Sequence, residues 1–374
     1  MKIERRYDID WIRVLAFDIL ILYHVNMFFV PWGWHIKNNE IVEWMRWPML
    51  FVNQWRIPIL FVVSGMGTRF VLYNKTGKQY IRERLSRLLI PLIAGILLVI
   101  PPQVYIERLA EGQFAGSFIE FYPHFFSGVY PDGNFSWHHL WFLPYLLLMS
   151  ILATPIFLNL RKGENKMLKW LHRKLDKSAF NLYLFAVPLF VVELFLEPFF
   201  PITHALVGDW YALASYSLLF IIGFVLISLG NSFWDSLNRI KAYTLITGII
   251  SFPLLLWLWF NFEVSIFIPI AKTINMWSWI LTIFAFAAKF LNRDSKLIRY
   301  RNRAVYPFYI LHQTITVICG FFLMNLHMHY ALKMLIMLVA TFGVSWFIYA
   351  FAILKIPILM PLFGVRSIKP NASS

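Results

Sequence analysis

Long apolar stretches are the feature that most restricts how this chain can fold. A helix needs about 20 predominantly apolar residues to cross the hydrocarbon core of a bilayer, and such stretches recur ten times. They cover residues 11–31, 48–72, 88–106, 140–160, 179–196, 210–229, 242–260, 273–291, 304–325 and 331–354. They lack the alternation of polar and apolar residues that is typical of membrane β-strands. The sequence therefore predicts an all-α, polytopic integral membrane protein with about ten transmembrane helices.

Composition excludes a water-soluble globule. Of the 374 residues, 59% are hydrophobic and only 14% are charged, whereas soluble domains carry about 25% charged residues. No repeat or soluble appendage is visible, so we expect residues 1–374 to form a single transmembrane domain. The first stretch contains Arg13, Asp18 and His24 and has no small-residue cleavage site. We therefore expect it to be a membrane span and not a cleaved signal peptide.

The net charge of +15 is concentrated in alternate loops. Most of the 34 Lys and Arg residues fall in the N-terminal segment, in residues 73–87, 161–178, 230–241 and 289–303, and in the tail after residue 354. Because cytoplasmic loops carry such an excess, both termini are predicted to be cytoplasmic. The basic residues thus indicate topology, with membrane lipids and not nucleic acid as the expected partner.

Segment 107–139 is a long loop, expected on the outer side, that is rich in aromatic residues and histidine. Its only adjacent histidines are His138 and His139, and no cysteine or carboxylate lies at a ligand spacing beside them. We therefore predict no metal site. Aromatic surfaces of this kind suit sugars equally well. His139 ends the segment, and Trp141 follows at the start of the next expected span. In the alternative interpretation His139 is an ordinary loop histidine and Trp141 an interfacial aromatic residue.

Ionisable residues inside the expected spans are candidates for function, because each costs roughly 2.5–3.5 kcal/mol on insertion scales. Arg13 and His24 lie eleven residues apart, which places both on one helix face about 16 Å apart. Alternatively, Arg13 reaches the headgroups and His24 bonds a backbone carbonyl. His312 is a second histidine expected near the membrane middle. Asp18 is expected to neutralise an arginine of the second span, although a mechanistic role stays open.

Two further patterns each have a structural and a functional interpretation. Ser64-Gly65-x-Gly67 in the second span favours close helix packing, or room for a ligand beside the Ser64 hydroxyl. Arg84 and Arg87 lie three residues apart where the third span begins. They are either positive-inside residues or a clamp for the phosphates of an anionic ligand.

The ordered set of these motifs resembles the membrane-bound acyltransferase family 3. The motifs are DWIR followed by His24, then FVVSG, RERLSR before LLIP, HLWFL, and YPFYILHQ. The resemblance extends from residue 7 to about residue 363. Each motif alone is weak, but the ordered set on ten spans is fairly specific. Within the family, the chain is most similar to a branch that transfers succinyl groups.

This resemblance implies an O-acyltransferase in the bacterial cytoplasmic membrane. The expected reaction moves an acetyl or succinyl group from cytoplasmic acyl-CoA, a co-substrate, to a hydroxyl of a glycan outside the membrane. Carried over by motif, Arg13 and His24 match the family's essential pair, and His312 matches a histidine that recurs in the branch. The arginine motif matches Arg84 and Arg87, and the span-two motif matches Ser64 and Gly65.

The expected roles follow from these matches. His24, Arg13 and His312 are expected to be catalytic, and Arg84, Arg87, Ser64 and Gly65 to bind the acyl-CoA. His139 and Trp141 would receive the acceptor, and Arg56 could hold the charge of a succinyl group. The esterase-like domain of some members is missing, so a separate glycan-handling protein is a possible partner. The rival function is a transporter or flippase of a lipid-linked glycan that uses the same buried polar residues, although no inverted repeats are visible.

Overall fold

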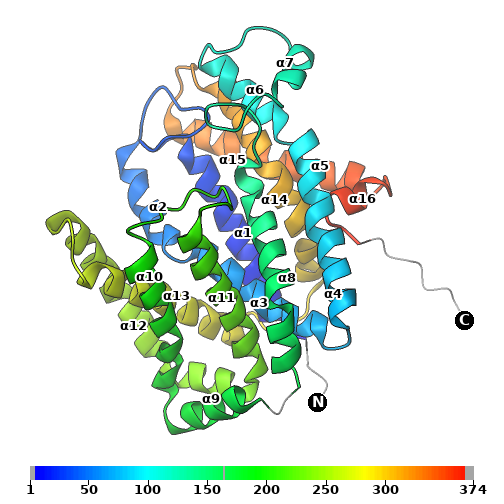
Figure 1. The fold of residues 1–374 in the computed structure, drawn as a ribbon. Helices are drawn as coiled ribbons and strands as arrows, with labels where there is room; N and C mark the ends of the chain where they lie inside the picture. Colours follow the sequence, from blue (N-terminus) through cyan, green and yellow to red (C-terminus); the bar gives the residue numbers. More distant parts are fainter. Residues whose placement is uncertain (1–4, 163–164, 367–374) are drawn as a thin grey trace, which may run out of the picture. The chain divides into compact units, whose positions relative to one another are not determined.

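The computed structural model describes residues 5–162 and 165–366, and these residues are helical apart from loops and one isolated bridge between Val129 and Phe135 (Figure 1). The sequence of α-helices is α1 (Tyr7–Met27), α2 (Arg46–Asn53), α3 (Arg56–Leu72), α4 (Gly77–Arg84), α5 (Ile90–Leu98), α6 (Pro101–Ala110), α7 (Phe118–His124), α8 (Phe142–Leu160), α9 (Lys166–Lys177), α10 (Ala186–Leu196), α11 (Trp210–Ser228), α12 (Asn231–Asn261), α13 (Phe267–Phe290), α14 (Lys296–Leu323), α15 (Tyr330–Phe347) and α16 (Leu359–Leu362). Short 3-10 or π turns join some of them: η1 (Glu43–Met45), η2 (Leu85–Leu89), η3 (His138–Trp141), η4 (Ala179–Phe185) and η5 (Ile348–Ile353).

The predicted fold class, an all-α polytopic membrane protein, is confirmed. Within the described ranges, nine helical stretches are long and apolar enough to cross a membrane, and they coincide with nine of the ten expected spans. The remaining expected span is α1, a helix of 21 residues that carries Asp8, Asp10, Arg13 and Asp18. The direction in which the helices cross the bilayer stays a prediction.

Several helix boundaries differ from those expected, and two of the differences have a clear local reason. Helix α1 ends at Met27, before the predicted residue 31, because Pro31 and Gly33 follow and neither favours a continued helix. Helix α12 begins at Asn231, whereas residues 230–241 were predicted to be a basic loop. Buried Phe233 and Leu237 give its first turns an apolar face despite their polar composition.

The chain divides into two compact units, each built from three separate segments. Unit 1 comprises Met1–Ala16, Leu50–Arg82 and Tyr145–Asn302, and unit 2 comprises Phe17–Met49, Glu83–Pro144 and Arg303–Ser374. The prediction of one transmembrane domain therefore stays a prediction, and each unit is described by itself.

In unit 1, helix α3 packs tightly on α11, and α12 packs on α13. Glycines allow the close contact between α3 and α11. A Cβ atom added to Gly65 would lie 1.9 Å from the carbonyl oxygen of Phe220, and one added to Gly223 would lie 2.0 Å from the carbonyl oxygen of Val62. The two backbones approach this closely only because neither glycine has a side chain.

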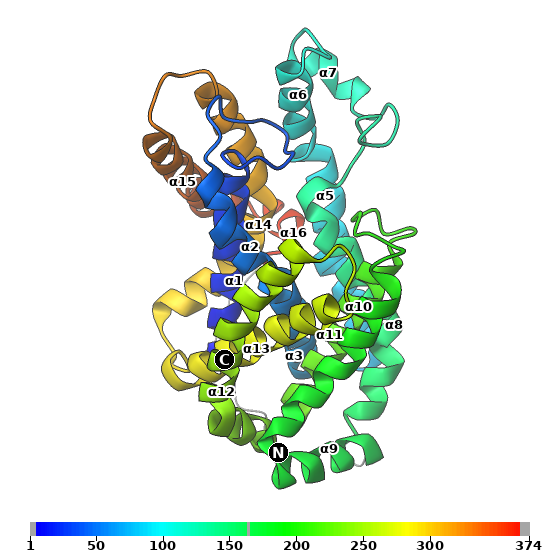
Figure 2. The ribbon, with the colours of Figure 1, turned by 90° about the vertical axis from the view of Figure 1, so that its left-hand side faces the viewer.

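In unit 2, the end of α1 packs with α14 and α15, as Figures 1 and 2 show. Val25 and Phe28 follow His24 in the sequence, and they share one buried apolar cluster with Val317 of α14 and Met337 of α15. This packing fixes α1 and α14 at the level where each carries a histidine.

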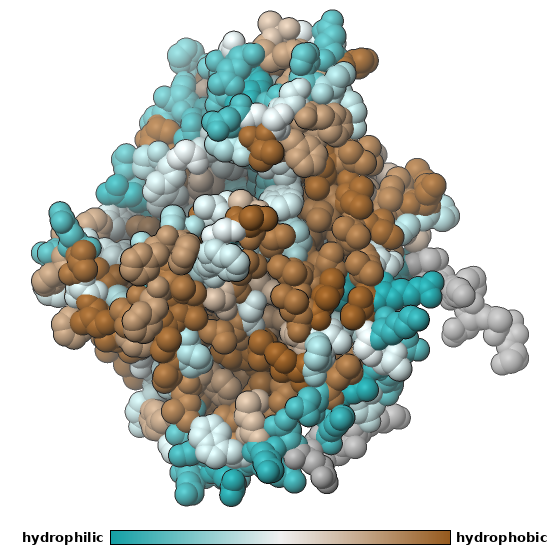
Figure 3. All heavy atoms as spheres, in the orientation of Figure 1, coloured by the Kyte–Doolittle hydropathy of each residue, from teal (hydrophilic) through white to brown (hydrophobic). Residues whose placement is uncertain are grey.

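Large apolar side chains are exposed on several helices, as the lipid-facing surface of a membrane protein requires. Ile93 and Leu98 on α5 and Ile250 and Trp257 on α12 are each at least half exposed. In Figure 3, apolar residues cover α5 in unit 2 and α10 in unit 1, whereas hydrophilic residues gather over α9.

Candidate active site

His24 of α1 and His312 of α14 face each other in unit 2. Nδ1 of His24 lies 2.7 Å from Nε2 of His312. The two rings are nearly parallel, with an angle of 4° between their planes and centroids 5.0 Å apart. His312 is fully buried, and His24 is partly exposed. The structure thus brings together the two histidines that the sequence placed near the membrane middle.

The hydrogen bonds of His312 determine where the protons of the pair lie. Its Nδ1 is 2.7 Å from the carbonyl oxygen of Tyr309 and 3.2 Å from that of Phe308. Because a carbonyl only accepts, Nδ1 of His312 donates, and the lone pair of a neutral His312 is on Nε2. His24 therefore donates from Nδ1 to His312, which assigns the lone pair of His24 to Nε2. An imidazole held in this tautomer is arranged to act as a base.

His139 lies against the same pair. Its Nε2 donates to the carbonyl oxygen of Ile310 at 3.0 Å, and its ring is nearly perpendicular to that of His312, with centroids 5.0 Å apart. The side chain is only 5% exposed and lies in η3, unlike an exposed loop histidine, and its role toward the acceptor stays a prediction. Its Nδ1 is buried and has no hydrogen-bond partner among the described residues. Three histidines from α1, η3 and α14 thus form one cluster.

Arg13 lies in the part of α1 that belongs to unit 1. Its Nη1 donates to Oδ1 of Asn302 at 3.1 Å and lies 3.5 Å from Oδ1 of Asp10. Asn302 in turn donates to Asp10 at 3.0 Å. A Cβ atom added to Gly67 would lie 3.2 Å from Nη2 of Arg13, so this glycine leaves space for the guanidinium. Arg13 is therefore held by side chains of unit 1, and its catalytic role stays a prediction.

The Ser64-Gly65 motif has a packing role in unit 1. The space beside the Gly65 Cα atom is filled by the backbone of α11, including the carbonyl of Phe220. The Ser64 hydroxyl donates to the carbonyl oxygen of Leu60 at 2.7 Å. These contacts account for a small residue at position 65 without a ligand. Binding of the coenzyme by Ser64 and Gly65 stays a prediction.

Arg84 and Arg87 lie in unit 2 where α4 passes into the π turn η2, and their positive charges repel each other. Nη1 of Arg87 is 3.8 Å from Oε1 of Glu83, and Glu83 also pairs with Arg366. The Tyr306 hydroxyl is buried and has no hydrogen-bond partner among the described residues. The positive charges of Arg84 and Arg87 both act on it. Clustered guanidinium groups beside a hydroxyl donor suit an anionic ligand.

The remaining predicted site residues lie in different surroundings. Trp141 packs edge-on against Phe142 in unit 2, with ring centroids 6.3 Å apart. Arg56 begins α3 in unit 1, is buried, and donates to Oδ1 of Asn53 at 3.2 Å. Neither contact reveals a ligand, so the acceptor role of Trp141 and the succinyl role of Arg56 stay predictions.

The sequence did not identify Asn302, which holds Arg13, or a buried polar network that includes the neighbour of His312. Asn302 bonds Arg13, yet in the sequence it is one polar residue within the basic segment RYRNR. His35, Glu107 and Gln313 form a buried network in unit 2 through the 2.6 Å contact of His35 with Glu107 and the 2.9 Å contact of His35 with Gln313. Gln313 directly follows His312, which was the one available signal.

Comparisons with known proteins identify relatives of the chain. Residues 6–350 match the acyltransferase 3 family, whose description is an acyltransferase domain. The chain is also 26% identical over 164 residues to glucans biosynthesis protein C of Escherichia coli O6:K15:H31 (strain 536 / UPEC), of strain K12 and of strain O1:K1 / APEC. These matches cover 43% of this chain and 41% of each relative, so the chain spans about two fifths of their length. No solved structure matches.

The family match covers nearly the whole helical region and includes each motif from which the resemblance was argued. The chain belongs to the acyltransferase 3 family.

Proposed function

We propose that this protein is a membrane O-acyltransferase that moves an acyl group, acetyl or succinyl, from cytoplasmic acyl-CoA to a hydroxyl of an extracytoplasmic glycan. Family membership supports acyl transfer, and the printed name of the relatives, glucans biosynthesis protein C, supports a glycan acceptor. The observation that carries the proposal is the His24–His312 pair, because its hydrogen bonds assign a lone pair to Nε2 of a partly exposed intramembrane histidine.

The chemical step uses that lone pair. Nε2 of His24 takes the proton of the acceptor hydroxyl while the hydroxyl oxygen attacks the thioester carbonyl carbon. The carbon–sulfur bond then breaks, and the thiolate of coenzyme A receives the proton from His24. His312 accepts the Nδ1 hydrogen bond throughout and stabilises the imidazolium that forms between the two transfers. No net oxidation occurs, and the enzyme returns to its starting state.

Arg84 and Arg87 would hold the phosphates of the coenzyme. Both lie in a cluster with the buried hydroxyl of Tyr306, and guanidinium groups bind phosphate oxygens in pairs. Arg13, earlier on the same helix as His24, would orient the donor or stabilise the thioester oxyanion. In this proposal the arginine cluster faces the cytoplasm of the bacterial cytoplasmic membrane, where acyl-CoA is available.

Acyl transfer by purified variants tests the histidine pair. We expect His24→Ala and His24→Gln to lose at least about a hundredfold in rate, the lower end of what a general base contributes. His124→Ala changes an exposed histidine of the 107–139 segment and is the matched control. Wild-type rates in folded His24 variants would remove the proposed base. Movement of a lipid-linked glycan without acylation would instead favour the transporter.

Binding of coenzyme A tests the phosphate clamp separately. The double variant Arg84→Ala/Arg87→Ala should bind coenzyme A at least about tenfold more weakly, because bonds to charged groups contribute roughly 1.5–3 kcal/mol each. Arg82→Ala, an exposed arginine of the same helix, is the control. Equal affinities of the double variant and the wild type would exclude the clamp while leaving the histidine chemistry untouched.

A further inference from the structure

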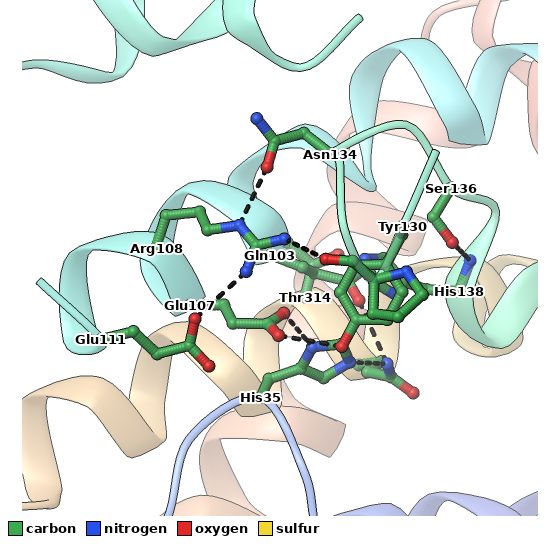
Figure 4. Close-up of polar contacts among 12 residues, drawn as sticks. His35, Gln103, Glu107, Arg108, Glu111, Tyr130, Asn134, Ser136, His138 and Thr314 are labelled. Carbon is green, nitrogen blue, oxygen red and sulfur yellow. Dashed lines mark hydrogen bonds and ion pairs between the residues drawn. The ribbon is translucent and has the colours of Figure 1, made fainter. Parts of the chain in front are cut away.

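A second group of ionisable side chains gathers in unit 2, apart from His24. It comprises His35 from the loop after α1, Glu107 from α6 and His138 at the start of η3 (Figure 4). One possible ligand atom from each residue lies within 4.8 Å of the other two. Glu107 is only 4% exposed, and the rings of His35 and His138 are perpendicular, with centroids 4.6 Å apart.

His138 has features that its packing alone does not explain. Its Nε2 atom is buried and has no hydrogen-bond partner among the described residues, which is energetically unfavourable when nothing binds there. Its backbone has a φ angle of 38°, a conformation that non-glycine residues seldom adopt. The Ser136 hydroxyl accepts a hydrogen bond from the His138 amide at 2.9 Å and helps to hold this backbone in place.

Surrounding side chains orient the possible ligands. The Tyr130 hydroxyl donates to Oε1 of Glu107 at 2.9 Å. On the other side, Nε2 of His35 lies 2.9 Å from the Gln313 amide, which also donates to Gln103 at 3.2 Å. Partners of this kind fix the ring orientation of histidines that bind metals.

Arg108 holds the loop that carries Tyr130. Its guanidinium donates to the carbonyl oxygens of Pro131 and Gly133 at 2.9 and 2.8 Å, and to Oδ1 of Asn134 at 2.9 Å. In Figure 4 this guanidinium faces Asn134 and Glu111, whereas the Glu107 carboxylate faces His35. The carboxylate is thus directed at the histidines and not at the adjacent arginine.

We propose that His35, Glu107 and His138 form a binding site for one divalent ion of the zinc class. Two imidazoles and one carboxylate are a ligand set that zinc uses in sites with a fourth, open position. Calcium and magnesium prefer oxygen ligands throughout, so they fit this set poorly. The open position would take one oxygen ligand from water or from a bound molecule.

Binding requires a small rearrangement. Nδ1 of His35 and Oε2 of Glu107 are 2.6 Å apart, whereas two ligands about 2.0 Å from one tetrahedral ion lie about 3.3 Å from each other. The ion therefore replaces the proton shared by this pair and moves the two atoms apart by about 0.7 Å. Rotation of the Gln313 amide would then offer its oxygen to the Nε2–H group of His35.

The sequence alone predicted no metal here, because no carboxylate lies beside His138 and His139 in the chain. The fold supplies one from α6 and a second histidine from the loop after α1. The proposal does not depend on acyl transfer, since it concerns a different set of side chains from the His24 pair.

Metal content and spectra test this site without an activity assay. The full chain, with any affinity tag removed, is stripped with EDTA and titrated with Zn²⁺ and with Co²⁺. We expect about one zinc ion per chain by elemental analysis, and the visible absorption of tetrahedral cobalt. Zinc well below one per chain at saturation, together with no cobalt band, would overturn the proposal.

Variants locate the ion. Glu107→Gln keeps the size of the side chain and should lower zinc affinity by at least about tenfold, as should His138→Asn, which tolerates the positive φ angle. His124→Ala is the control and should bind as the wild type does. If Glu107→Gln retains wild-type zinc affinity, the ion binds elsewhere and the assignment is wrong, whatever the folding of the His138 variant.

Discussion

Replacing Gly65 by alanine separates the two interpretations of the Ser64-Gly65 motif. The new Cβ atom would lie 1.9 Å from the carbonyl oxygen of Phe220 and 2.9 Å from the amide nitrogen of Phe224. An ordinary carbon–oxygen contact is about 3.3–3.6 Å, so the helices must separate by roughly 1.4 Å. Both obstructing atoms belong to the backbone, and neither can rotate away as a side chain could.

The expected cost follows from this overlap. Overpacking in a well-packed interior typically costs 1–3 kcal/mol and occasionally more, and the overlap here places Gly65→Ala at or above the upper end. Alanine in a helix regains about 0.5–1 kcal/mol relative to glycine. We therefore expect a net loss of at least about 2 kcal/mol, seen as a melting temperature lowered by several degrees.

Two other glycines provide matched comparisons. Nothing lies within 4 Å of a Cβ atom added to Gly343 of α15, so Gly343→Ala should melt at or slightly above the wild-type temperature. At Gly67 the nearest atom is the end of the Arg13 side chain, at 3.2 Å, and Gly67→Ala should lie between the two.

Tryptophan fluorescence of the purified protein in detergent measures the melting, and coenzyme A binding is measured on the same samples. If Gly65→Ala melts like Gly343→Ala but loses affinity for coenzyme A, the missing side chain serves a ligand and the packing argument is refuted. If it melts several degrees lower, close packing explains the glycine.

Three further changes test other parts of the structure. Asn302→Ala removes one hydrogen-bond acceptor of Arg13 and the donor to Asp10, and it should lower both melting temperature and acyl transfer, whereas Asn302→Gln keeps both amide groups and should retain more of both. Burial lowers the pKa of His204 to about 4 from its usual 6.5, so the unfolded chain binds the proton first and stability should fall as pH drops from about 6.5 to 4; melting at pH 7, 5.5 and 4.5 should show a smaller fall for His204→Asn. Lys333 is buried and donates to two asparagine side chains at 2.6 and 2.9 Å, so Lys333→Met should destabilise the protein by about 1–3 kcal/mol, whereas a melting curve of exposed Lys355→Met should match the wild type.

Hydropathy predicted the helices well because the bilayer imposes one length on every span. It placed their ends less well, since the ends depend on local residues and on contacts beyond the membrane. Helix α12 extends to Asn231 through a polar segment because Phe233 and Leu237 find a buried environment. A polar segment of this composition can form a loop or an amphipathic helix, and buried contacts like those of Phe233 and Leu237 decide between the two.

The candidate site was predictable in part for a related reason. An intramembrane histidine is conspicuous on energetic grounds alone, which selected His24 and His312 from the sequence. Their mutual hydrogen bond depends on the register between α1 and α14, which apolar packing around Val25 and Val317 sets and no local pattern encodes. For Gly65 the sequence left packing and ligand binding open, because both require a small residue.

The His35–Glu107–His138 cluster shows where local reasoning stops. A search for ligand spacing detects metal sites whose residues share one helix or one loop, and it rejected His138 and His139 because they have no neighbouring carboxylate. Glu107 is 72 residues from His35 in the chain, yet their side chains are 2.6 Å apart. Histidine and glutamate residues in separate loops are ordinary when each is exposed to water. They become exceptional only when the fold buries them together, because then each charge and each unpaired nitrogen must find a partner within the protein or in a ligand.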